Sequence, residues 1–284
     1  MNPKGVIRPA IKTDAHKINR FLQSGIRNHR HLDWQKPTEW LGRSPYLIHV
    51  SPDHSIDAVL NCVPEPKDVF WIRLFACKNI YKEIAYWESL FTSALGLITE
   101  QSLNPTIASL SYQKWFSDLL EAEGWHKQQY VIQLRWEGKK DKRFNSSDLN
   151  PSIRLMTVDD LDKVSTIDDI CFKPIWQQSR EAIGRAYYQS AYATVFEVNN
   201  SICGFQLSTN EYGKAHLARI AILPEFQRQH IGEQLVMNML QFFISIRITT
   251  ITVNTQEENT NSIGLYEKLK FKKTKDAFPI YIYK

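Results

Sequence analysis

The residues that could do chemistry stand in a turn between a strand and a helix. Residues 217–223 form a short, mostly apolar run, which predicts a buried strand, and Pro224 ends it because proline cannot donate to a sheet ladder. From Ile231 onward, apolar residues recur at helical spacing. A turn that opens a helix presents free backbone N–H groups at the positive end of the helix dipole. The turn at 227–232 is therefore a candidate anion site, with phosphate as the usual occupant.

Two side chains of this turn would support that role. Gly232 would let the backbone come close to a bound anion, and Arg228 would add a charge-assisted contact. The competing interpretation is an ordinary strand–turn–helix in an α/β core.

The run Pro-Glu-Phe-Gln-Arg-Gln-His-Ile-Gly resembles the pyrophosphate loop of the GNAT superfamily of N-acetyltransferases, whose pattern is Q/R-x-x-G-x-G/A. Gln227 takes the first place, Gly232 takes one glycine place, and His230 stands at the other. If that place requires a positive φ, histidine carries a modest steric cost. The resemblance implies acetyl-CoA as co-substrate. It implies that the coenzyme is held by Ile220, Ala221, Ile222, Gln227, Arg228, Gln229, His230, Ile231, Gly232, Glu233 and Asn259.

A second stretch, residues 259–271, resembles the GNAT segment N-x-x-A-I-x-L-Y-E-K-L-G-F. In that family the asparagine helps to hold the pantetheine arm, and the tyrosine can protonate the leaving thiolate. By position these residues are Asn259 and Tyr266, and the competing interpretation of Tyr266 is a core tyrosine. Lys270 stands where a glycine usually ends the helix in a left-handed turn, so we expect this helix to end differently.

The resemblance also implies a mechanism, in which an amine held between two splayed strands attacks the thioester directly. One branch of the family uses a glutamate as base, but Asn254 stands at that place and cannot accept the proton. Glu211 and His216 are the candidate substitutes, directly or through water, with Glu257 and Glu258 as further candidates.

Length and composition set the broad class. A chain of 284 residues predicts about two domains. No apolar run approaches the roughly 20 residues that span a bilayer, and the first residues lack a signal core, so we expect a cytoplasmic protein without a membrane partner. The net charge of +5 suits an anionic cofactor, but no dense basic cluster predicts nucleic-acid binding. The four cysteines are scattered, which predicts reduced thiols and no metal site.

The two halves of the chain open and close alike. Residues 6–10 and 153–156 each predict a strand with an Ile-Arg pair, followed by an acidic cap and a helix, and residues 115–125 resemble 265–271. We therefore expect an α/β (α+β) protein of two tandem GNAT-like domains, each a mixed, mostly antiparallel sheet flanked by helices. The domains span 1–138 and 151–284, with a polar linker at 139–150.

The first half departs from the pattern. Its turn at 78–83 has no glycine, and Leu120 stands at the tyrosine place, so we expect this half not to catalyse acetyl transfer. The segment 29–46 contains His29, His31 and two tryptophans. It is either a packing loop or a recognition surface, and two histidines alone do not make a metal site.

The function that follows is N-acetyl transfer from acetyl-CoA to a primary amine, on a small molecule or on a peptide or protein N-terminus. The run 220–235 looks closest to the branch that acetylates protein N-termini. The alternative is a catalytically weak or inactive acyl-CoA-binding or regulatory protein, favoured by His230, Asn254 and Lys270. A basic nucleic-acid-binding protein is a distant third. Monomer and homodimer both remain open.

Overall fold

The computed structural model describes residues 5–24, 27–138 and 150–284. They form two compact units, Met1–Gln129 with Phe278–Lys284, and Tyr130–Ala277. Both units are mixed α/β structures in which helices flank antiparallel and mixed sheets, as expected from the sequence.

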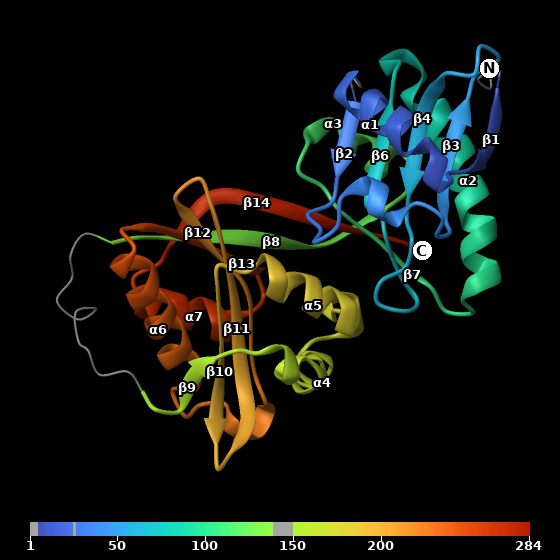
Figure 1. Ribbon diagram of the computed structural model, residues 1–284. Helices are drawn as coiled ribbons and strands as arrows, with labels where there is room; N and C mark the ends of the chain where they lie inside the picture. Colours follow the sequence, from blue (N-terminus) through green and yellow to red (C-terminus); the bar gives the residue numbers. More distant parts are fainter. Residues whose placement is uncertain (1–4, 25–26, 139–149) are drawn as a thin grey trace. The chain divides into compact units, whose positions relative to one another are not determined.

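The N-terminal unit holds β1–β7 and α1–α3 together with the beginning of β8 and the end of β14 (Figure 1). The bounds of its elements are β1 Val6–Pro9, α1 Ala15–Ser24, β2 Arg27–Arg30, β3 Tyr46–Val50, β4 Ile56–Asn61, β5 Val69–Trp71, β6 Leu74–Cys77, α2 Glu83–Gln101, β7 Thr106–Leu110, α3 Lys114–Ala122 and β8 His126–Glu137.

One sheet of this unit has the order β1-β3-β4-β6-β2, and β7 pairs with β5 and with the end of β14. Alternate residues of β3 and β4 pack into two different hydrophobic cores, one on each face of the sheet. One core packs under α2 and α3 around Trp87 and Phe116, and the other packs under α1 around Ile18 and Phe21. This alternation is the two-residue period of a strand that is buried on both faces.

The C-terminal unit carries the remaining elements, and its sheet order is β14-β8-β13-β12-β11-β10-β9. In Figure 1, α4 and α5 lie on one face of this sheet, and α6 and α7 on the other. The bounds are β9 Ile153–Leu155, α4 Leu161–Cys171, α5 Arg180–Gln189, β10 Tyr192–Val198, β11 Ser201–Glu211, β12 Lys214–Ile222, α6 Ile231–Ser245, β13 Thr250–Gln256, α7 Thr260–Lys268 and β14 Lys272–Tyr283.

The units do not divide where the sequence predicted. Residues 131–137 of β8 pair with β13 of the C-terminal unit, whereas residues 280–283 of β14 pair with β7 of the N-terminal unit. The chain therefore changes unit within two strands, at Gln129 and at Ala277. Except for Asn150, the predicted linker at 139–150 lies outside the described residues.

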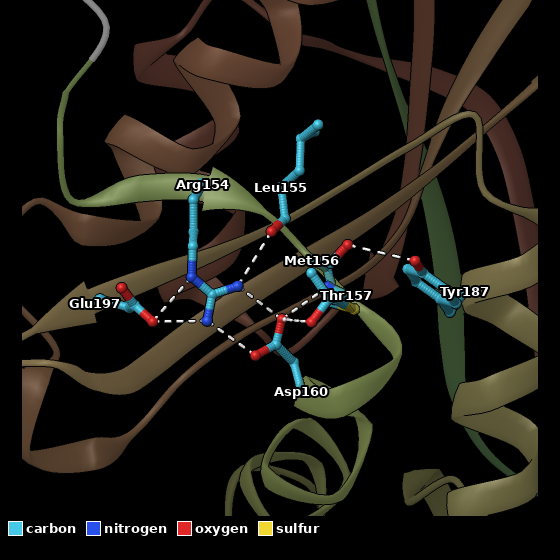
Figure 2. Close-up of polar contacts among 7 residues, drawn as sticks. All are labelled: Arg154, Leu155, Met156, Thr157, Asp160, Tyr187 and Glu197. Carbon is cyan, nitrogen blue, oxygen red and sulfur yellow. Dashed lines mark hydrogen bonds and ion pairs between the residues drawn. The ribbon is translucent and has the colours of Figure 1, made fainter.

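The duplicated opening is visible at the level of single atoms. In the C-terminal unit, Arg154 Nη1 donates to Asp160 Oδ2 at 2.7 Å and Nη2 to Asp160 Oδ1 at 2.8 Å, as Figure 2 shows. In the N-terminal unit, Arg8 donates to the two oxygens of Asp14 at the same two distances. Each aspartate also accepts from the backbone N–H three residues before it, at the start of a helical turn. This arginine–aspartate pair explains the repeated Ile-Arg and acidic cap.

Candidate functional site

Strands β12 and β13 run parallel and then part. They pair only through Ala215–Leu217 and Ile251–Val253. Beyond that point β12 continues along β11, from Gln206↔Ile220 to Gly204↔Ile222, and β13 continues along β8. Within the described chain, the edge of β12 at 220–222 therefore has no strand on the β13 side, which is the splayed arrangement that the resemblance implied.

A β-bulge marks the parting. The register between β11 and β12 shifts so that Leu207 faces Arg219 and Ser208 faces Leu217, which leaves Ala218 as an extra residue. A bulge bends its strand and increases the local twist. The bend in β12 directly precedes the free edge at 220–222.

Beyond β12, an exposed turn leads into α6. Arg228 has a φ of 63° and His230, the N-cap of α6, a φ of 62°. The glycine place that His230 occupies thus requires the left-handed backbone, and a non-glycine residue there carries steric strain. The side chains of Gln227 and Gln229 fold back within the turn, where they donate to the carbonyls of Ile222 and Glu225 at 3.0 and 3.1 Å.

Glu233 occupies the first turn of α6 with a paired carboxylate. Its Oε2 accepts from Lys268 Nζ at 2.6 Å and lies 2.9 Å from His230 Nδ1. The bond from Lys268, with that of His230, holds the pKa of Glu233 below its usual value. An acidic side chain thus lies where an anion would bind, because the helix dipole favours negative charge at that end.

Gly232 lies where α6 packs against neighbouring elements. A Cβ at this position would lie 3.3 Å from Ile222 Cδ1 and from Leu265 Cδ2. The glycine therefore allows β12 and α7 to pack closely against α6. Ile231 beside it is a buried core residue.

Asn259 lies at the start of α7, and Tyr266 lies in its last turn. Asn259 is the N-cap, and its side-chain oxygen accepts from the Ser262 N–H at 3.2 Å. Tyr266 is only 2% exposed and packs against Phe271, with ring centroids 5.6 Å apart. Burial raises the pKa of Tyr266, so the phenol stays protonated.

The end of α7 corrects an expectation from the sequence. Lys270 adopts a left-handed φ of 71°, and the N–H groups of Lys270 and Phe271 donate back to Glu267 and Tyr266. Gly124 ends α3 in the same way, with a φ of 76°. The lysine therefore closes its helix with the turn that usually holds glycine, instead of ending it differently.

The candidate bases lie at different points of the β11–β12 hairpin and β13. His216 Nδ1 is 2.8 Å from Thr252 Oγ1, and burial lowers the pKa of His216 to about 4. Glu211 is exposed and faces Lys214 across the hairpin end. Asn254 faces Gln133 on β8, whose amide donates to it at 3.4 Å. Of these residues, His216 is nearest along β12 to the point where the strands part.

An ion pair beside the bulge was not predicted from the sequence. Arg219 donates from Nε and Nη2 to the two oxygens of Asp168, both at 2.7 Å, and its guanidinium lies over the Phe172 ring at 3.5 Å. Asp168 is fully buried. The one indication in the sequence was an arginine, Arg219, within an otherwise apolar strand. Its partner on α4 could not be identified from the spacing of residues.

The N-terminal unit has the same strand parting, but the free edge is filled. Strand β5 pairs in parallel with β7, and after Arg73 its continuation β6 pairs with β4 instead. Arg73 corresponds to Arg219 in register and binds Asp33 at 2.6 Å. Strand β2, which the sequence did not predict, pairs with β6 from Arg27↔Cys77 to Arg30↔Leu74. It occupies the edge that β12 leaves without a strand.

In the part of the chain that the structure describes, no helix is long and apolar enough to cross a bilayer. In the same residues, no group of three or more His, Cys, Asp or Glu side chains is arranged to hold a metal ion.

The chain is similar to known proteins both in the sequence of its C-terminal unit and in its fold. Residues 161–271 match the acetyltransferase (GNAT) family, and no curated protein sequence matches the chain. Three solved structures share the fold over nearly the whole length. They are a GCN5-related N-acetyltransferase from Sphaerobacter thermophilus (12% identity, TM-score 0.61, 100% of this chain and 96% of that one), a tandem GNAT protein from the clavulanic acid biosynthesis pathway solved without AcCoA (12%, 0.65, 98% and 98%), and a putative acetyltransferase from Pyrococcus horikoshii (14%, 0.63, 98% and 88%).

Proposed function

We propose that this GNAT-type chain transfers an acetyl group from acetyl-CoA to a primary amine. Residues 161–271 match the acetyltransferase (GNAT) family, and the chain shares the fold of a tandem GNAT protein. The acceptor is a small molecule or a peptide or protein N-terminus. The observation that carries this proposal is the parting of β12 and β13 after Leu217 and Val253, directly before the turn at 227–232. A free strand edge next to a helix N-terminus suits an extended ligand that ends in phosphate groups.

In this proposal the coenzyme is bound mainly by backbone groups. The edge at 220–222 bonds the pantetheine arm and the acyl carbonyl, and the turn from Gln227 to Glu233 binds the pyrophosphate. Arg228 is exposed within that turn and adds positive charge. Asn259, at the start of α7, holds the pantetheine arm.

The chemical step is direct attack of the neutral amine on the thioester carbonyl. The amine nitrogen forms the new C–N bond, the C–S bond breaks, and Tyr266 supplies a proton to the leaving thiolate. Holding the two reactants together accounts for much of the acceleration. Either His216 or Glu211, directly or through water, takes the proton that the amine loses. His216 is neutral at pH 7 but is a weak base, because its pKa is about 4.

A second candidate function is acyl-CoA binding with little or no turnover. The pairing of Glu233 with Lys268 favours it, since the paired carboxylate lies at the helix end that the pyrophosphate would use. The burial of Tyr266 also favours it, since a core side chain has restricted access to a substrate.

We propose further that the N-terminal unit does not catalyse transfer. Strand β2 takes the edge of β6 that would have to bond an acyl-CoA, and Leu120, at the position of the tyrosine, has no proton to give.

The test is titration calorimetry with acetyl-CoA on the full chain and on Arg228→Glu. Arg247→Glu is the matched control, because Arg247 is also exposed and left-handed, with a φ of 64°, but lies at the other end of α6. We expect micromolar binding that weakens about tenfold or more in Arg228→Glu alone, since a charge-assisted hydrogen bond is worth about 1.5–3 kcal/mol. Equal affinity in all three proteins would reject the turn as the pyrophosphate site. Binding without acetylation across a panel of amines would favour the second function.

A further inference from the structure

A histidine and a threonine bond each other across the short stretch that joins β12 to β13. His216 lies opposite Thr252, one residue before the two strands part after Leu217 and Val253. His216 Nδ1 is 2.8 Å from Thr252 Oγ1. One residue of strand is about 3.3 Å long, so the imidazole lies next to the gap in which the proposed transfer takes place.

These two side chains lie on the face of the sheet that is turned away from α6 and α7. Their strand neighbours Leu217, Ile251 and Val253 belong to the core that packs against α6. Because successive residues of a strand point to opposite faces, His216 and Thr252 point to the face on which α4 and α5 lie (Figure 1). Both residues are half-buried there.

The surroundings of the threonine hydroxyl favour one direction for the bond to the histidine. The hydroxyl has one hydrogen, and it donates this hydrogen to the Ala215 carbonyl at 3.4 Å, which can only accept. Oγ1 is then an acceptor towards His216, so Nδ1 donates and carries the ring proton. Burial lowers the pKa of His216 to about 4, so the ring is neutral at pH 7 and Nε2 keeps a lone pair.

Nε2 is the nitrogen of His216 that a substrate can reach. It has no hydrogen-bond partner in the described chain, yet it is not one of the polar atoms that are buried there without a partner, so part of its surface is open. Glu211, the other candidate base, lies at the exposed end of the β11–β12 hairpin, opposite Lys214. His216 thus combines a place beside the gap with a lone pair held in a fixed direction.

We propose that Thr252 is a positioning residue that holds His216 with Nδ1 protonated, so that Nε2 accepts the proton that the amine loses. This inference rests on the proposed acetyl transfer and chooses between its two candidate bases. As the C–N bond forms and the C–S bond breaks, the proton moves from the amine nitrogen to Nε2. The resulting imidazolium still donates through Nδ1 to Thr252, and it then returns the proton to water.

The position of the ring proton can be measured without coenzyme or amine. Long-range ¹⁵N–¹H NMR spectra of the full chain, labelled with ¹⁵N in histidine, distinguish a protonated ring nitrogen from a bare one. The spectrum of His216→Gln identifies the signals of His216. We expect a protonated Nδ1 at pH 7 in the wild type and the loss of this preference in Thr252→Val. A protonated Nε2 in the wild type would overturn the proposal, whether or not the chain acetylates an amine.

Kinetics test whether this positioning matters for the transfer. The matched control for Thr252→Val is Thr250→Val, because Thr250 is also half-buried on the same face of β13 and is not part of the proposed site. We expect Thr252→Val to lower kcat about tenfold with little change in KM, since a positioned base contributes about 100-fold or more. Thr252→Ser keeps the hydroxyl and should keep most of the activity, and Thr250→Val should match the wild type.

A double variant shows whether Thr252 acts through the histidine. If it does, Thr252→Val should lower kcat no further in a chain that already carries His216→Gln. Equal losses in the two backgrounds, or an equal loss in Thr250→Val, would overturn the proposal. A wild type that binds acetyl-CoA but acetylates no amine would reject the proposed function and with it the role of Nε2, while the NMR spectra would still show whether Thr252 sets the position of the proton.

Discussion

Arg219 binds the buried carboxylate of Asp168 through two hydrogen bonds of 2.7 Å, one to each oxygen. This pair connects α4 to the bulge of β12, directly before the strand edge that we propose to bond the coenzyme. The contact therefore links the stability of the C-terminal unit to the position of its proposed site.

Asp168→Asn should lower the free energy of unfolding by about 3 kcal/mol, because breaking a buried ion pair leaves an uncompensated charge. Asp162→Asn on the same helix is the control, since the Asp162–Arg180 pair has the same 2.7 Å distance but is exposed. That control should lose less than about 1 kcal/mol in urea denaturation. Equal losses in the two variants would contradict the role given to burial.

Gly124 ends α3 and Lys270 ends α7. Replacing each of them by the residue found at the other position should change the free energy of unfolding in opposite directions. Lys270→Gly removes a lysine from a left-handed backbone and should stabilise the protein by about 0.5–1 kcal/mol, after allowance for the added freedom of the unfolded chain. Gly124→Lys should cost about 1 kcal/mol for backbone reasons alone, since a Cβ there would meet nothing within 4 Å. Thermal unfolding of the two variants measures this, and a loss of stability in Lys270→Gly would contradict it.

The turn into α6 was predictable because its signals are local. Apolar periodicity from Ile231 and the break at Pro224 located strand, turn and helix, and the structure shows that the place of His230 does take a positive φ. The conformation of Lys270 was mispredicted because residue preference is weaker than the hydrogen bonds that close a helix. Strand β2 was missed because Arg27–Arg30 shows no apolar alternation, and β6, its partner, lies more than 40 residues away.

Glu233→Gln should strengthen the binding of acetyl-CoA about threefold to tenfold. The change removes a negative charge from the N-terminal turn of α6 and releases Lys268 and His230 to meet phosphate groups. Glu267→Gln is the control, because Glu267 is exposed on α7 and makes no such pair with Lys268 among the ion pairs found in the described residues. Calorimetry compares the dissociation constants, and weaker binding in Glu233→Gln would mean that this carboxylate helps the coenzyme site.

Tyr266→Phe should lower kcat about 100-fold and leave the affinity for acetyl-CoA unchanged, if the phenol protonates the thiolate. A thermal melt of the variant separates catalysis from packing, since the ring that contacts Phe271 is retained. An unchanged kcat would assign Tyr266 to the core alone.

Acid should destabilise the protein through its buried histidines. Burial lowers the pKa of His29 to about 3 and that of His216 to about 4, both below the unfolded value of 6.5. The unfolded state therefore binds more protons between those limits, so this stability is complete above about pH 6.5 and is lost as the pH falls. At pH 5 each histidine should account for about 2 kcal/mol.

Urea denaturation from pH 7.5 to 5 measures this loss of stability. A His216→Gln variant should show a shallower dependence on pH than the wild type. Identical slopes in the two proteins would show that His216 is accessible to protons in the folded state.

The exchange of strands between the units has a consequence for synthesis on the ribosome. Tyr281 is fully buried in the N-terminal core, and its hydroxyl lies 2.6 Å from Glu121, yet it follows Glu121 by 160 residues in the sequence. The N-terminal unit, although its first residues are made earlier, cannot complete its core until translation has passed through Tyr130–Ala277. A chaperone that protects unfinished chains would therefore meet an open apolar core around Trp125 and Phe91 while the C-terminal unit is being made.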